Sequence, residues 1–277
     1  MKARNLGWRV AAALIVTALA VGACAAAPPP VSPSTAPTPA PLGPFPSDQV
    51  DGLRTDVDVA FTGVTECGGT PCRVPGDVIA PADGSQHPTI VLLNGGGKLF
   101  NERRYQAPLA VELARRGAVV FLMPYRGIMT ANYDSDSISD ARCAVRYARA
   151  HTAEYGGDPE RLLLVGHSQG GVMGLQIAIE PDEPSEECLA DGSAKPDGVV
   201  ALGSPRPPLG HAGATAPPMW LIAGSEDRVG KADVEALREA GFDAEGIVLA
   251  GVTHDGVTDP AAAPQIVDLI MDALGSI

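Results

Sequence analysis

The chain has 277 residues, a formal net charge of −13 and an aromatic content of 4%. A charge this negative argues against nucleic acid as a partner and against direct binding of the folded part to anionic lipid. The low aromatic content disfavours a broad stacking platform for polysaccharide, whereas the length is enough for a large hydrophobic core.

The N-terminus has the pattern of a secretory signal peptide. A basic start is followed by an apolar run, residues 10–21, which is too short for a comfortable membrane span. The Val-Gly-Ala-Cys sequence at 21–24 resembles a bacterial lipobox, in which the cysteine becomes the lipidated first residue. We expect residues 1–23 to be removed and Cys24 to anchor an exported protein to the outer side of a membrane of the bacterial cell envelope. Ordinary cleavage near Ala23, or a retained anchor, is the alternative.

Two regions follow the predicted anchor. Residues 24–47 consist mostly of Ala, Pro, Ser and Thr, a composition that cannot form a core, and this predicts a disordered tether. The rest of the chain, residues 48–277, is expected to form one globular domain.

Four further cysteines suit a disulfide-bonded exported protein. Cys67 and Cys72 flank a Gly-Gly-Thr-Pro turn that could close a small hairpin, so we expect these two to pair. The remaining two, Cys143 and Cys188, would then form the second disulfide. A zinc site is the alternative for four cysteines, but the pairs lack the compact C-x-x-C spacing, and no metal is expected.

Apolar runs and turn residues divide the domain into alternating elements. We expect strands at residues 56–62, 73–80, 89–93, 118–123, 161–165, 198–202, 219–223 and 246–250. We expect helices at residues 105–116, 134–155, 172–179, 231–240 and 266–274. The alternation after residue 89 predicts an α/β fold, in which a mostly parallel central sheet carries helices on both faces. Ligand chemistry then belongs at the carboxyl ends of the strands.

The sequence Gly-His-Ser-Gln-Gly at 166–170 joins an expected strand to an expected helix. In this context the motif predicts a nucleophile elbow, a tight turn that strains the backbone of Ser168 and exposes its hydroxyl at a helix N-terminus. Gly166 and Gly170 lack the side chains that would clash with the neighbouring strand and helix. A glycine-rich turn with an incidental serine is the alternative.

A serine hydroxyl needs a base to take its proton, and histidine supplies one near neutral pH. Of the five histidines only His254 follows the last expected strand, in the chain order Ser, Asp, His that this architecture requires. His167 adjoins the serine, but neighbouring side chains in an elbow point different ways. The acid that orients the base should follow the intervening strand, where Glu226 and Asp227 both lie; Asp255 is poorly placed beside His254.

These motifs resemble those of the α/β-hydrolases, and within them the compact esterase and dienelactone-hydrolase-like branch, over roughly residues 55–277. The resemblance implies an α/β-hydrolase fold with little or no cap domain. The family's Gly-x-x-Asp-x-Val pattern, matched at 224–229, implies Asp227 as the acid. Tyr125 and Arg126 also follow a strand on the active-site side and are candidates for lining the pocket, although residues at such a position more often pack or pair structurally.

The tetrahedral intermediate of ester cleavage needs preorganised hydrogen-bond donors. One is expected to be the backbone N–H of Gln169, directly after the nucleophile. The Asn94-Gly-Gly-Gly sequence resembles the His-Gly-Gly-Gly motif of esterases, with Asn in place of His, and implies a further donor at Gly96 or Gly97. Lys98 is the alternative donor.

These residues predict a serine hydrolase that cleaves carboxylic esters through an acyl-enzyme, with no cofactor or metal. The short segment between the nucleophile helix and strand 198–202 leaves little room for a cap, which favours short-acyl or exposed esters as small-molecule substrates. The alternatives are a peptidase, thioesterase or acyltransferase of the same superfamily, and a surface binding lipoprotein that has lost catalysis. A dienelactone hydrolase would usually carry Cys, where this chain has Ser168.

Overall fold

A computed structural model describes residues 52–96, 100–127, 133–209, 215–227 and 231–277. The predicted signal peptide, Cys24, the tether and its boundary at residue 48 lie outside these residues, as do Gly97 and Lys98. In the described part of the chain, no helix is both long enough and apolar enough to cross a bilayer.

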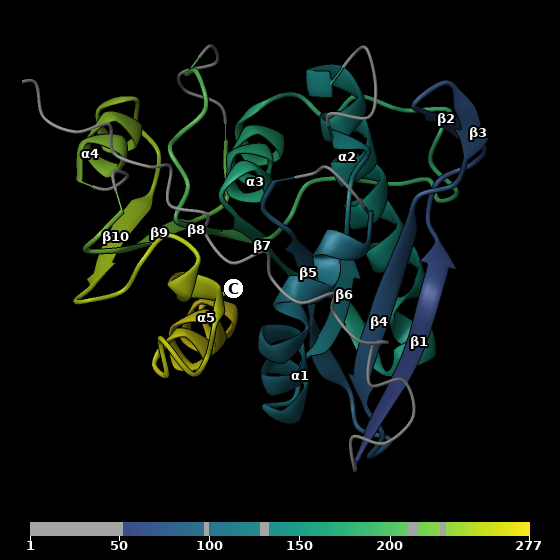
Figure 1. The fold of residues 1–277 in the computed structure, drawn as a ribbon, viewed down its shortest axis with the longest axis horizontal. Helices are drawn as coiled ribbons and strands as arrows, with labels where there is room; N and C mark the ends of the chain where they lie inside the picture. The colour runs from purple at the N-terminus through teal and green to yellow at the C-terminus, as the bar shows by residue number, and fades with distance from the viewer. Residues whose placement is uncertain (1–51, 97–99, 128–132, 210–214, 228–230) are drawn as a thin grey trace, which may run out of the picture. The chain divides into compact units, whose positions relative to one another are not determined.

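An eight-stranded sheet forms the centre of the fold (Figure 1). Its strand order is β1-β4-β6-β5-β7-β8-β9-β10. The strands from β6 to β10 pair in parallel, whereas β1 and β4 extend one edge of the sheet with antiparallel pairing. The bounds are β1 Leu53–Ala60, β4 Pro75–Pro81, β5 His87–Leu93, β6 Val119–Met123, β7 Gly157–His167, β8 Gly198–Leu202, β9 Met219–Gly224 and β10 Ala244–Leu249.

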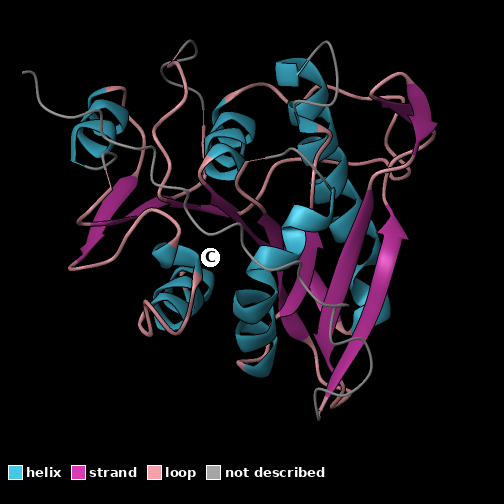
Figure 2. Cartoon of the chain, in the orientation of Figure 1, coloured by secondary structure: helices cyan, strands magenta, loops and turns pink. Residues whose placement is uncertain are grey.

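Helices cover both faces of the sheet, as Figures 1 and 2 show. Residues of α2, α3 and α4 pack into the core on one face, and residues of α1 and α5 pack into the core on the other. Their bounds are α1 Ala107–Arg115, α2 Tyr133–His151, α3 Gln169–Ile179, α4 Lys231–Glu239 and α5 Ile266–Gly275. Short 3-10 helices lie at η1 Phe100–Gln106, η3 Thr152–Tyr155 and η4 Gly256–Thr258.

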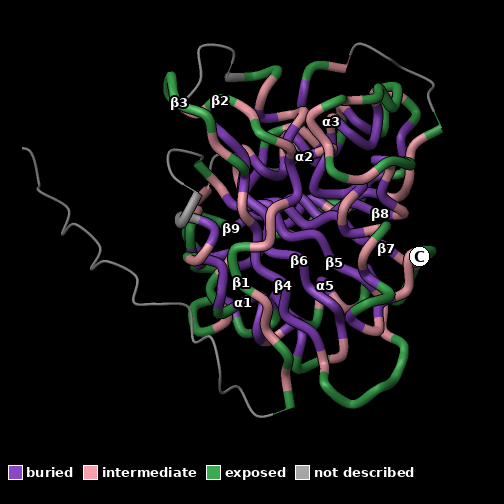
Figure 3. The backbone as a smooth tube through the Cα atoms, turned by 90° about the vertical axis from the view of Figure 1, so that its right-hand side faces the viewer, coloured by how far each residue is buried: buried purple, intermediate pink, exposed green. Residues whose placement is uncertain are grey.

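The inner strands are largely buried, as Figure 3 shows. Every residue of β6 and of β8 is buried. Continuous apolar runs of this kind are expected for parallel strands that helices cover on both faces. The edge strand β10, in contrast, mixes buried and exposed positions.

The chain reverses its direction across the sheet at β5. The next strand in the chain, β6, lies on one side of β5, and β7 lies on the other. The helices that follow β5 and β7, α1 and α3, consequently lie on opposite faces. Open α/β sheets bind ligands at such a switch point, outside the carboxyl ends of the strands.

The expected strands and helices after residue 89 are all present, as the predicted α/β fold requires. The largest difference is at β7, which begins at Gly157 rather than at residue 161. Gly157 and Asp158 pair with the start of β5 before a register shift. The polar residues ahead of Leu162 hid this pairing from the sequence pattern.

The two predicted disulfides are both present. Cys67 and Cys72 join β2 (Thr65–Cys67) to β3 (Thr70–Cys72), a separate two-stranded hairpin between β1 and β4. Cys143 of α2 bonds to Cys188, which lies in the connection between α3 and β8. That connection, residues 180–197, contains no helix or strand, and Cys188 forms an isolated bridge with Thr62.

Candidate active site

Ser168 lies in a tight turn between β7 and α3. Its φ is 50° and its ψ is −116°, a positive-φ conformation that residues with a side chain rarely adopt. A Cβ on Gly166 would lie 2.3 Å from the carbonyl oxygen of Gly170, and one on Gly170 would lie 2.6 Å from that of Asn94. Only glycine fits at these two positions. The turn therefore has the strained, close-packed geometry of a nucleophile elbow.

Two hydrogen bonds connect Ser168, His254 and Asp227. Nε2 of His254 lies 3.1 Å from Oγ of Ser168, and Nδ1 lies 2.7 Å from Oδ2 of Asp227. A carboxylate can only accept, so Nδ1 carries the donated proton and Nε2 is left to accept the serine hydroxyl. The side chain of Asp227 is 7% exposed and that of His254 is 43% exposed. This is the arrangement of nucleophile, base and orienting acid that activates a serine.

The three side chains come from loops at the carboxyl ends of β7, β9 and β10. The geometry distinguishes Asp227 from the two other acidic candidates. Glu226 and Asp255 are both exposed, and neither forms a hydrogen bond with His254 among the described contacts. Of the three acids, Asp227 is thus the one whose carboxylate is hydrogen-bonded to the His254 ring.

Gly203, directly after β8, is a constraint that the sequence analysis missed. Its φ is 56°, and a Cβ at this position would lie 2.9 Å from Oδ2 of Asp227 and 3.2 Å from Nδ1 of His254. A side chain would therefore push against the Asp–His pair itself. The one available signal was a glycine placed immediately after the strand that neighbours the nucleophile strand.

His167 is buried beside this constellation, and no hydrogen bond among the described contacts joins its ring to Ser168. Its Nε2 lies 3.1 Å from the backbone oxygen of His254, which can only accept, so Nε2 carries a proton. The centroids of the two imidazole rings are 4.9 Å apart. Burial lowers the pKa of His167 below its ordinary value, which keeps the ring neutral beside His254. His167 therefore ties the elbow to the loop that carries His254, a role that the sequence did not indicate.

The predicted oxyanion donors lie on two segments around the elbow. Gln169 is the first residue of α3, so its N–H has no acceptor one turn earlier in the helix. Gly95 lies against the elbow, because a Cβ on it would be 2.4 Å from Nδ1 of His167. Gly96 is exposed and has a φ of 76°. Gly97, the other predicted donor, is outside the described residues.

Tyr125 and Arg126 are buried and bonded to protein groups. They are 1% and 2% exposed, respectively. The hydroxyl of Tyr125 donates to carbonyl oxygens of the loop after β5, and the guanidinium of Arg126 pairs with Asp140. Both residues therefore pack and pair within the protein, which is the more common of the two roles that the sequence left open.

One group of potential metal ligands occurs among the described residues. His167, His254 and Asp255 each offer one ligand atom, and these atoms lie within 4.8 Å of one another. Both ring nitrogens of His254 are already engaged with Ser168 and Asp227. A metal here would have to displace the serine–histidine contact, so the group does not suit a resident metal.

Comparison with known sequences gives partial matches to esterases. The family model described as BD-FAE matches residues 77–202. A probable carboxylic ester hydrolase of Mycobacterium tuberculosis, LipM, is 34% identical over 98 residues, which are 35% of this chain. The chain covers only 22% of the length of that relative.

Comparison with solved structures extends over most of the chain. An esterase of Thermogutta terrifontis with bound propionate has a TM-score of 0.60 and 20% identity, covering 78% of this chain and 94% of that one. A truncated carbohydrate esterase from gut microbiota has a TM-score of 0.64 and 17% identity, covering 83% and 99%. In fold, this chain is an α/β-hydrolase.

Proposed function

We propose that this protein is a serine hydrolase that cleaves carboxylic esters. The observation that carries the proposal is the hydrogen-bonded series Ser168–His254–Asp227 at a strained elbow. The similarity to the M. tuberculosis ester hydrolase and to the T. terrifontis esterase supports esters as the substrate class. In another structure the T. terrifontis esterase is phosphorylated by paraoxon, which is consistent with a reactive nucleophile on this fold.

The reaction follows from the protonation states in the site. Oγ of Ser168 attacks the acyl carbon, and its proton passes to Nε2 of His254. Asp227 stabilises the imidazolium that forms, and His254 then gives the proton to the leaving alcohol. Water enters, loses a proton to His254 and attacks the acyl-enzyme, which releases the acid and restores Ser168.

The oxyanion of each tetrahedral intermediate needs donors on the side of the elbow that faces the substrate. The N–H of Gln169 is free of a helical acceptor and stands at the positive end of the α3 dipole. We assign the second donor to the loop that begins at Asn94, through Gly96 or Gly97. The contacts of Asn94 and Gly95 with the elbow support this assignment.

Short-acyl or otherwise exposed esters fit the site best. The connection between α3 and β8 contains no helix or strand, and its Cys188 is bonded to α2, so this segment supplies no cap over the elbow. The partial exposure of His254 also fits an open site. Long acyl chains generally need an extended apolar surface to remove them from water.

The alternative from a different class is a binding lipoprotein that has lost catalysis. An intact and connected Ser, His and Asp favours the enzyme, because selection for binding alone does not require this geometry. Peptidase, thioesterase and acyltransferase activities use the same machinery and are distinguished by substrate and product analysis.

We further propose that Cys24 carries a lipid anchor that holds the protein on the outer side of a membrane of the bacterial cell envelope. The basic start, the apolar run and the lipobox-like sequence support export and lipidation. The two disulfides fit an oxidising compartment. Cells fed a tagged palmitate should label the wild-type chain and leave Cys24→Ser unlabelled; equal labelling of both chains would exclude Cys24 as the acceptor.

The decisive experiment is hydrolysis of p-nitrophenyl esters, from acetate to palmitate, by the full-length chain. We expect turnover of the short esters that is lost in Ser168→Ala and kept in Ser193→Ala. Among the described contacts, the Ser193 hydroxyl accepts only the N–H of Lys195. No turnover and no fluorophosphonate label on Ser168 would favour the binding protein. Labelling without turnover would mean active machinery with a different substrate.

A further inference from the structure

Tyr125 connects the end of β6 to the loop that follows β5. Its side chain is 1% exposed, and its hydroxyl lies 3.1 Å from the carbonyl oxygen of Asn94 and 2.9 Å from that of Gly96. Carbonyl oxygens only accept and the phenol has a single O–H, so its one proton is shared between the two oxygens in a bifurcated hydrogen bond. A single tyrosine therefore fixes two peptide groups of this loop.

The same loop lies against the elbow on both sides of the nucleophile. A Cβ on Gly95 would lie 2.4 Å from Nδ1 of His167. A Cβ on Gly170 would lie 2.6 Å from the carbonyl oxygen of Asn94. His167 precedes Ser168 and Gly170 follows it by two residues. Movement of this loop would consequently displace the backbone around Ser168.

We infer that Tyr125 is a positioning residue, whose hydroxyl holds the Asn94–Gly96 loop in the orientation that stabilises the oxyanion. In a trans peptide the C=O and N–H point in opposite directions. Drawing the Asn94 carbonyl toward the phenol therefore turns the N–H of Gly95 away from it. The next peptide, which carries the N–H of Gly96, lies between the two bound carbonyls, and its own oxygen accepts a hydrogen bond from Nδ2 of Asn94 over 2.9 Å. Gly96, with a φ of 76°, has the backbone freedom to flip a peptide if the phenol were absent.

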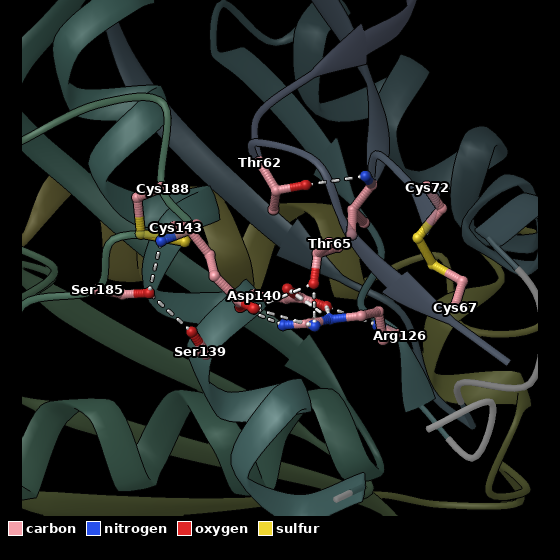
Figure 4. A network of polar contacts seen from close by, with 12 residues as sticks. Thr62, Thr65, Cys67, Cys72, Arg126, Ser139, Asp140, Cys143, Ser185 and Cys188 are labelled. Atoms are coloured by element: carbon pink, nitrogen blue, oxygen red, sulfur yellow. Dashed lines mark hydrogen bonds and ion pairs between the residues drawn. A yellow bond between two sulfur atoms is a disulfide. The ribbon is translucent and has the colours of Figure 1, made fainter. Parts of the chain in front are cut away.

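The backbone next to Tyr125 is itself clamped, as Figure 4 shows around Arg126 and Asp140. The N–H of Arg126 donates to Oδ2 of Asp140 over 2.8 Å, and its Nε lies 2.9 Å from the same oxygen. The far end of the guanidinium bonds to Thr65 of β2 and to Glu187. These contacts hold the backbone at residue 126 from three separate segments. The neighbouring Tyr125 therefore extends from a backbone that is fixed in position.

The consequence for catalysis rests on the proposed ester hydrolysis. A flipped peptide would present a carbonyl oxygen where the developing negative charge needs a donor, and the two negative groups would repel. This penalty applies to the tetrahedral intermediate and much less to the neutral ester. Loss of the phenol should therefore lower kcat and leave KM nearly unchanged.

The test compares Tyr125→Phe with Tyr155→Phe in the full-length chain. Tyr155 is also largely buried and its hydroxyl bonds to Asp56, but it precedes β7, at the opposite end of that strand from Ser168. With p-nitrophenyl acetate we expect Tyr125→Phe to lose about 10- to 100-fold in kcat with KM within about twofold, and Tyr155→Phe to keep both. An unchanged kcat in Tyr125→Phe, an equal loss in Tyr155→Phe, or a loss confined to KM would overturn the inference.

A trifluoromethyl ketone gives a second readout, because Ser168 adds to its carbonyl carbon and leaves an oxyanion. Its Ki should rise in Tyr125→Phe by the same factor as kcat/KM falls; an unchanged Ki contradicts the inference.

Should Tyr125→Phe not fold, Gly96→Ala perturbs the loop at an exposed position. It must lower kcat while Gly192→Ala, another positive-φ site with open space around it, does not. Wild-type kcat in Gly96→Ala would then overturn the inference.

The wild-type chain separates failure of this inference from failure of the proposed function. Absence of hydrolysis and of a fluorophosphonate label on wild-type Ser168 defeats both. A wild-type chain that is active and labelled, combined with an active Tyr125→Phe, defeats only the role of Tyr125.

Discussion

Asp227 accepts a hydrogen bond from His254 over 2.7 Å, and the carboxylate is far more buried than the ring that it orients. A buried carboxylate needs a donor, and Nδ1–H of His254 supplies one. The bond fixes the tautomer in which Nε2 can accept the proton of Ser168. In the proposed mechanism, Asp227 therefore sets the orientation of the base.

Asp227→Asn should abolish most of the activity without unfolding the protein. The amide can donate to Nδ1, which would place the ring proton on Nε2 and point it at the serine. We expect kcat on a short p-nitrophenyl ester to fall about 10³- to 10⁴-fold. Glu226→Gln is the matched control, since Glu226 is the adjacent exposed acid. Equal effects of the two variants would refute the assignment of Asp227.

Gly203→Ala should damage the same pair by a steric route. The added methyl would lie 2.9 Å from Oδ2 of Asp227, at a φ of 56° that alanine also disfavours. We expect kcat to fall by at least about tenfold, because displacements of about 1 Å at reacting groups lower rates strongly.

Gly192→Ala separates backbone strain from displacement of the Asp–His pair. Gly192 has a φ of 100°, and a Cβ there would have nothing within 4 Å. Both variants should lose stability, by about 1 kcal/mol from the unfavourable φ alone, but only Gly203→Ala should lose kcat. Thermal unfolding measures the loss of stability, and steady-state kinetics on the same samples measures the loss of kcat. Full activity in Gly203→Ala would show that the Asp227–His254 pair tolerates the added methyl.

The parts of the fold that the sequence could predict are those with a local cause. β8 has the predicted bounds because an apolar run lies between a polar residue and a glycine. The elbow was predictable because its motif is local. The glycine at 166 avoids the carbonyl oxygen of Gly170 four residues later, although the glycine at 170 avoids that of Asn94 in a distant segment. The order of Ser168, Asp227 and His254 followed from the expectation that strand ends gather at one edge of the sheet.

The parts that could not be predicted depend on contacts between distant segments. Gly203 matters only because β8 ends beside the Asp–His pair. The bond of His167 to His254 and the bonds of Tyr125 to the β5 loop join residues far apart in the chain. Neither periodicity nor turn residues indicate such contacts. The early start of β7 at Gly157 could not be predicted either, because it depends on pairing with the distant strand β5.

Asp140 should give the stability of the protein a distinctive pH dependence. Burial raises the pKa of Asp140 to about 6, although the ion pair with Arg126 opposes this change. Between the unfolded pKa of about 4 and the folded pKa of about 6, the folded state therefore holds a proton that the unfolded state has lost. The contribution of this group is complete below about pH 4 and is lost as the pH rises through about 6.

Asp140→Asn removes this titration and is the test. Urea denaturation between about pH 4 and pH 7 should show the unfolding free energy of the wild type falling relative to that of the variant, by up to about 3 kcal/mol. The pH dependence of the unfolding free energy is compared between the two proteins because the other carboxylates contribute equally to both. Parallel profiles for the two proteins would show that Asp140 is already ionised throughout the range.

The two disulfides should contribute unequally to stability, because they close loops of different length. Cys143 and Cys188 are 45 residues apart, whereas Cys67 and Cys72 are 5 apart. In the chain-entropy account, the long loop is worth about 4 kcal/mol and the short loop about 2 kcal/mol. Removing the first pair also frees the segment that holds Glu187 against Arg126. Paired Cys→Ala replacements, compared by guanidinium denaturation, should therefore destabilise the protein in that order; the reverse order would show that the β2–β3 hairpin supports the fold more than loop length indicates.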